Sequence, residues 1–116
     1  MLSLGDGLVF STLREKLPML NPTPMERMVD ERGRPYFLPG LNMTLEQFQK
    51  ALADPNPQAR AVFLAELLRN ARPDDVFFLV SPRELRAMWS LVEGYLGSRE
   101  DFWSWLLDSL QERGLA

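Results

Sequence analysis

The chain of 116 residues contains no cysteine and no histidine. The absence of cysteine excludes disulfide bonds, thiolate nucleophiles and thiolate metal ligands, and makes a reducing cytoplasm the default location. The absence of histidine excludes the usual general base of Ser-His-Asp and Cys-His enzymes and the ligands of Cys/His zinc sites. Any catalysis would therefore depend on carboxylate, lysine, tyrosine or arginine side chains.

Long apolar runs and cofactor motifs are missing as well. No apolar run is longer than Val76 to Val80, which is far shorter than the roughly 20 residues of a membrane helix. No basic region precedes the apolar residues at the N-terminus, which argues against a signal peptide. The patterns GxxxxGK[ST], GxGxxG, GxSxG and SxxK are also absent. We expect a cytoplasmic protein without cofactors that is not an enzyme.

The amino-acid composition is that of an ordinary folded domain. Hydrophobic residues make up 46% and charged residues 25% of the chain, which is close to the average of globular proteins and argues against disorder. The net charge of −3 and the sequence pI near 4.9 disfavour nucleic-acid binding, which usually needs a basic surface.

Residues 1–43 are predicted to form an N-terminal arm and connecting segment, because five of the nine prolines lie before residue 40. One short amphipathic helix is expected here, after Asp6, with Val9, Phe10, Leu13 and Leu17 on one face and Pro18 near its end. A helix on a proline-rich tether can fold back on its own domain or exchange onto another copy of the chain, and the sequence does not decide between the two.

Residues 44–116 are predicted to form a helical domain. Thr44 and Gln47 have the spacing of a capping box that opens a helix over residues 45–53. Asn56 and Pro57 then start a second helix that ends near residue 70 and is apolar around most of its circumference, as expected of a central helix.

Three further helices are expected toward the C-terminus. The segment Val76 to Val80 is predicted as the body of a short helix, with a strand as the alternative. Ser81 caps the next helix, with Glu84 as the reciprocal partner, and this helix runs to Leu96 and stops at Gly97. Ser98 is expected to cap the last helix, whose end Gly114 marks. The predicted fold is mainly α, a compact bundle of about five or six short helices with an N-terminal arm and one short extended or hairpin segment near residues 28–38.

The segment DERGRPYFLPGLNMTLEQF, residues 30–48, contains two predicted turns, at Gly33 and at Pro39-Gly40. Between them, residues 36–38 are expected to form a short extended rung that buries Phe37 and turns the Tyr36 hydroxyl toward water or a partner. The predicted partner-binding residues of this segment are Arg32, Arg34 and Tyr36.

A second group of candidate binding residues lies on the last two helices. On their helix, Met88, Leu91 and Tyr95 lie to one side of the apolar face that is expected to pack against the core. On the last helix, Trp105 lies on the flank, whereas Phe102 falls within the arc expected to face the core. Exposed Trp, Tyr and Met residues dominate interface cores, so these four are predicted to bind a protein partner or a second copy. The alternative is that a neighbouring helix or the arm covers them.

Two other functions have some support in the sequence. Arg83 and Arg86 could form the recognition face of a helix-turn-helix regulator, but the acidic surroundings argue against DNA binding. Asp74 with Asp75, or Glu100 with Asp101, could hold magnesium in a metal-dependent enzyme, but carboxylates in a first helical turn are expected for dipole reasons alone. We therefore predict no metal site.

Two resemblances add to this interpretation. Residues 44–70, TLEQFQKALADPNPQARAVFLAELLRN, resemble a single HEAT-like helical hairpin, although no second copy follows. More widely, RPYFL, MT, ADPNPQARAVFLAELLRNARPDDV, LVSPRE and FWSWLL resemble a group of small bacterial proteins often encoded beside AbiEii-family nucleotidyltransferase toxins. This resemblance implies an accessory or antitoxin-like role and brings no catalytic residues.

Overall fold

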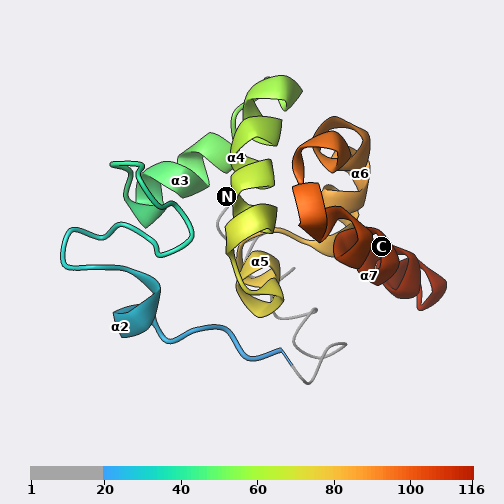
Figure 1. Ribbon diagram of the computed structural model, residues 1–116, viewed down its shortest axis with the longest axis horizontal. Coiled ribbons are helices and arrows are strands. Elements are labelled where there is room, and N and C mark those ends of the chain that lie inside the picture. The colour runs from blue at the N-terminus through green and yellow to red at the C-terminus, as the bar shows by residue number, and fades with distance from the viewer. Residues whose placement is uncertain (1–19) are drawn as a thin grey trace.

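The computed structural model describes residues 20–116, which form a compact, mainly α bundle (Figure 1). The expected fold class is thereby confirmed. Within this range the structure contains no strand, and the only β-type pairing is an isolated antiparallel bridge between Val29 and Pro35. The elements in chain order are α2 (Met25–Met28), α3 (Leu45–Leu52), α4 (Pro57–Asn70), α5 (Pro73–Leu79), α6 (Pro82–Val92), the 3-10 turns η1 (Glu93–Tyr95) and η2 (Gly97–Arg99), and α7 (Glu100–Glu112).

The expected helix after Asp6, and any exchange of the arm between copies, lie outside the described residues. The division at residue 43 stays a prediction. Within the described range, Met28, Phe37 and Leu38 are buried in the same core cluster as the helices that follow.

Local signals set the starts of three helices as the sequence predicts. Thr44 Oγ1 accepts from the Gln47 backbone, and the Gln47 side chain accepts from the Thr44 backbone, which completes a capping box at α3. Asn56 caps α4 through the Gln58 N–H at 2.9 Å. Ser81 caps α6 through the Glu84 N–H, but the Glu84 carboxylate accepts from the Ser81 hydroxyl and not from its backbone.

Helix α4 occupies the centre of the bundle. Helix α3 and the loop that follows α2 lie on one side of it, and α6 and α7 lie on the other (Figure 1). A polar contact ties α7 to α4 inside the core, because the buried Trp103 donates its indole N–H to the Leu68 carbonyl at 2.9 Å. The fully buried large side chains come from helices α2, α3, α4, α6 and α7 and from two connecting segments: Met28, Phe37, Phe48, Leu67, Leu68, Leu85, Leu96, Trp103 and Leu107.

The segment Val76 to Val80 is helical up to Leu79, so the helix prediction is confirmed and the strand alternative is wrong. The connection between α6 and α7 differs from expectation. Helix α6 ends at Val92, and the chain continues as two 3-10 turns instead of a single helix to Leu96. Ser98 does not cap α7, since it lies inside the turn η2 and the N-cap position is Arg99.

The hairpin near residues 28–38 is present. Asp30 and Arg34 pair through their backbones, Tyr36 N–H donates to the Met28 carbonyl, and Gly33 adopts the positive φ of 79° that the turn requires. The expected extended rung at residues 36–38 is wrong, because the Leu38 N–H donates to the Pro35 carbonyl and closes a turn. A turn buries the consecutive residues Phe37 and Leu38 together, which an extended strand, whose side chains alternate between faces, does not do.

None of the helices within residues 20–116 combines the length and the apolar content that crossing a membrane requires.

Candidate functional site

Four large apolar side chains are exposed along α4, η1 and α7. Tyr95 is 69% exposed, Trp105 63%, Val62 62% and Phe102 37%. Two arginines lie between them. We refer to the whole set as the aromatic–arginine surface: Val62, Arg69, Tyr95, Arg99, Phe102 and Trp105.

Direct contacts join the members of this surface from Tyr95 to Trp105. The Arg69 guanidinium donates to the Tyr95 carbonyl at 2.9 Å, and the Arg99 guanidinium donates to the Arg69 carbonyl at 3.2 Å. The guanidinium carbon of Arg99 lies 5.9 Å from the centroid of the Phe102 ring, and the Phe102 and Trp105 centroids are 6.1 Å apart. Hydrogen bonds to backbone carbonyls therefore position the two guanidinium groups, and ring contacts join Arg99, Phe102 and Trp105.

A hollow of about 410 Å³ lies at the Tyr95 end of the surface. The small residues Ala61 and Ala65 of α4 are buried beneath it, and Val62 and Tyr95 are its exposed apolar side chains. Glu66 lies beside it in an ion pair with Arg69. The hollow is apolar at its base and polar at its rim, a common composition of binding sites.

The second predicted group of binding residues is only partly exposed. Tyr95 and Trp105 are exposed, Leu91 is half-buried, and Met88 is 8% exposed and belongs to the core. Met88 and Leu91 line another hollow of about 400 Å³ between α4 and α6. Arg60 also lines it, and its guanidinium donates to the Asp54 carbonyl at 2.7 Å and to the Met88 sulfur at 3.6 Å.

The first predicted group lies on the other side of α4, in the hairpin. Arg32 is exposed at its tip, and Arg34 makes an ion pair of 2.8 Å with Asp30. The backbone N–H groups of Arg32 and Arg34 also donate to Asp30, and the bond from the Arg34 backbone contributes most to lowering the pKa of that carboxyl. Arg34 and Tyr36 line a hollow of about 470 Å³ beside the hairpin.

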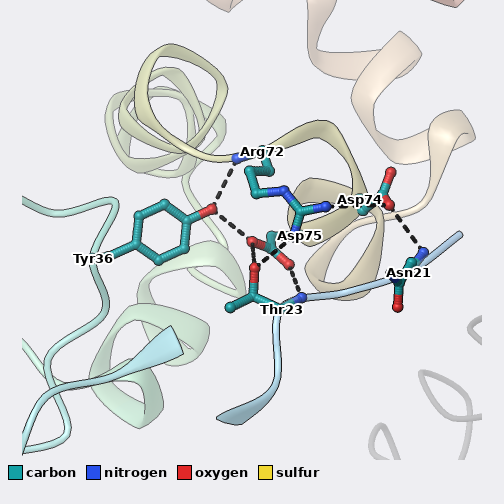
Figure 2. Close-up of polar contacts among 6 residues, drawn as sticks. All are labelled: Asn21, Thr23, Tyr36, Arg72, Asp74 and Asp75. Atoms are coloured by element: carbon teal, nitrogen blue, oxygen red, sulfur yellow. Dashed lines mark hydrogen bonds and ion pairs between the residues drawn. The ribbon is translucent and has the colours of Figure 1, made fainter. Parts of the chain in front are cut away.

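Tyr36 is 40% exposed, but its hydroxyl has hydrogen-bond partners within the chain, which the sequence did not predict. The hydroxyl donates to the Asp75 carboxylate at 2.6 Å and accepts from the Arg72 N–H at 2.9 Å (Figure 2). Burial of the hydroxyl and its bond to Asp75 raise the pKa of Tyr36 to about 12. The predicted binding residue Tyr36 therefore has a structural partner inside the chain.

Asp75 is the one charged residue that is fully buried in the described part of the chain. Its carboxylate accepts from the Thr23 N–H and from the Thr23 hydroxyl, both at 2.7 Å, in addition to Tyr36. The Arg72 guanidinium donates to the same Thr23 hydroxyl at 2.8 Å (Figure 2). Asp75 thus connects the hairpin and the chain segment before α2 to α5, which sequence spacing gave no reason to expect.

Both carboxylates of the pair Asp74 and Asp75 accept hydrogen bonds within the chain. Asp74 accepts from the Asn21 N–H at 2.9 Å, while Asp75 makes the contacts described above. Within residues 20–116 no three carboxylates come together as a metal site would need. Of the arginines considered for DNA recognition, Arg86 pairs with Asp108 at 3.4 Å and Arg83 donates to the Gly114 carbonyl.

In comparisons with known proteins, no protein-family model, curated protein or solved structure matches this chain. The aromatic–arginine surface therefore has to be interpreted from its own chemistry. Sequence reasoning identified Tyr95 and Trp105 but not Val62, Arg69, Arg99 or Phe102. Phe102 was expected in the core, and no signal in the sequence predicted that Arg69 and Arg99 would lie between the two aromatic groups.

Proposed function

We propose that the protein is a non-enzymatic helical binding protein, and that it binds another protein or a second copy of itself through the aromatic–arginine surface. The observation that carries this proposal is the unbroken series of contacts from Tyr95 through Arg69 and Arg99 to Phe102 and Trp105. Tyr, Trp and Arg are the residues in which the binding energy of protein interfaces is concentrated.

The rigidity of this surface supports the proposal. Helices carry Arg69, Phe102 and Trp105, and the guanidinium groups of Arg69 and Arg99 are held by backbone carbonyls. Side chains that are already ordered lose little conformational entropy on binding, so more of the contact energy is available as affinity.

The resemblance to proteins encoded beside AbiEii-family nucleotidyltransferase toxins supplies a candidate partner. On this basis we propose an accessory or antitoxin-like role, in which such a nucleotidyltransferase is bound. This assignment of the partner depends on the resemblance, whereas the assignment of the binding surface depends on the contacts and exposures given above.

The experiment compares the wild-type chain with Val62→Glu, Trp105→Glu and Gln49→Glu, each tagged and co-expressed with an AbiEii-family nucleotidyltransferase from the same genome. Gln49 is exposed on α3, on the other side of α4, and controls for the added charge. We expect co-purification with the wild type and Gln49→Glu, and its loss with the other two. The mass of each purified chain in solution is measured in parallel to detect self-association. A monomeric wild type that co-purifies with no protein would contradict the proposed function.

A further inference from the structure

The exposed side of α7 carries opposite chemistry on the two flanks of Trp105. At about 100° per residue, Asp101, Asp108 and Glu112 lie within about 60° of Trp105 on one flank, and Phe102 and Arg99 lie about 60° and 120° away on the other. All three acidic residues are exposed. One flank is therefore acidic, and the other is aromatic and ends in a guanidinium group.

The arginine on the second flank is fixed in place. Arg99 donates to the carbonyls of Arg69 at 3.2 Å and of Ala71 at 3.5 Å, and it contacts the Phe102 ring. It has no carboxylate partner within residues 20–116. Asp101 likewise has no ion-pair partner in that range. Each of these unpaired charges can accept an opposite charge from outside.

The direction of the two-fold axis in a dimer determines which flanks of the two α7 helices meet. A two-fold axis parallel to α7 places the acidic flank of one copy against the arginine flank of the other, whereas an axis perpendicular to α7 places like flanks together. Arg99 and Asp101 are two residues apart, which is only about 3 Å along the helix axis. In the parallel arrangement they therefore meet at nearly the same height when the seam passes between Phe102 and Trp105, so that Trp105 of each copy lies against Phe102 of the other.

We propose that a second copy of this chain binds the α7 part of the aromatic–arginine surface, with the two α7 helices parallel about a two-fold axis. Trp105 and Phe102 supply the apolar centre, and Arg99 of each copy pairs with Asp101 of the other. This inference rests on the proposed function and specifies the partner. The Val62–Tyr95 end of the surface stays open to a different protein.

The first test measures mass by sedimentation equilibrium over a range of concentrations. We expect a dimer for the wild type, a dissociation constant raised about 30-fold by Trp105→Glu, as for an interface hot spot, and about 10-fold by Asp101→Arg. A mixture of Asp101→Arg and Arg99→Glu chains is expected to form a heterodimer, since both charge pairs are then opposite in sign. Thermal unfolding of each variant shows whether the fold is kept.

The second test uses the absence of cysteine from the chain. Glu112→Cys provides a single thiol, which in the parallel arrangement lies at the same height as its copy and close enough to be joined to it by a short bifunctional thiol reagent. In an antiparallel arrangement centred on Trp105, the two thiols would lie about 21 Å apart and would not be joined. Gln49→Cys on α3 is the control that should stay uncrosslinked.

The outcomes separate this inference from the proposed function. If the wild type is monomeric but still binds a protein in a Val62-dependent way, the proposed binding of a second copy is wrong and the proposed function stands. A dimer that is insensitive to Trp105→Glu, or whose Glu112→Cys variant is not crosslinked, also overturns the inference. A wild type that is monomeric and binds no protein would contradict both the proposed function and this inference.

Discussion

The hydroxyl of Tyr36 and the carboxylate of Asp75 are 2.6 Å apart, although 39 residues separate them in the chain. The carboxylate is fully buried and takes its remaining hydrogen bonds from Thr23. A buried charge is tolerated only where its hydrogen bonds are satisfied. This pair therefore holds the hairpin and the segment before α2 against α5.

Replacing Asp75 by Asn is expected to lower the free energy of unfolding by about 2 to 4 kcal/mol, because one amide oxygen cannot accept from three donors and the NH₂ group meets donors. Urea denaturation monitored by tryptophan fluorescence measures the change. Asp74→Asn is the matched control, since Asp74 is only partly buried and accepts a single backbone hydrogen bond from Asn21. Equal effects of the two substitutions would contradict the role given to Asp75.

The raised pKa of Tyr36 predicts a loss of stability at alkaline pH. The pKa of Tyr36 rises from 10.0 to about 12 on folding, so its contribution is complete below pH 10 and is lost as the pH rises from 10 through about 12. We expect the unfolding free energy of the wild type to fall in this window relative to that of Tyr36→Phe. Tyr95 is present in both proteins and cancels in the comparison. Parallel pH curves would contradict the prediction.

The two tryptophans of α7 at positions 103 and 105 should respond differently to the same substitution. Trp103→Phe removes the hydrogen bond to Leu68 and leaves a space in the core, at a cost of about 2 to 4 kcal/mol. Trp105→Phe changes an exposed side chain and should cost less than about 0.5 kcal/mol. Chemical denaturation of both variants provides the measurement, and similar losses would show that Trp105 also supports the fold.

Two glycines give a further matched pair. Gly40 has a φ of 81°, and an added Cβ would meet nothing within 4 Å, so Gly40→Ala should cost about 1 to 2 kcal/mol from backbone strain alone. Gly94 lies in η1 without a positive φ and is equally open, so Gly94→Ala should be neutral or stabilise by up to about 1 kcal/mol. Thermal melts of the two variants test the difference in sign.

The fold class and most helix starts follow from local sequence signals, because these features depend on neighbouring residues. Thr44 and Gln47 form the predicted capping box, Asn56 and Ser81 cap the expected helices, and Gly33 and Gly40 adopt positive φ. A cap or a turn needs only a few adjacent residues, so its signal is present in the linear chain.

Packing between distant segments sets which of the remaining apolar residues are buried and which polar groups form hydrogen bonds with each other. Met88 enters the core beside Arg60 while Tyr95 stays exposed, although both lie on the same flank of their predicted helix. Phe102 leaves the core to contact Trp105, and Tyr36 turns its hydroxyl to Asp75. These outcomes depend on residues distant in sequence that compete for the same space and the same hydrogen bonds, and helical periodicity carries no information about such competitors.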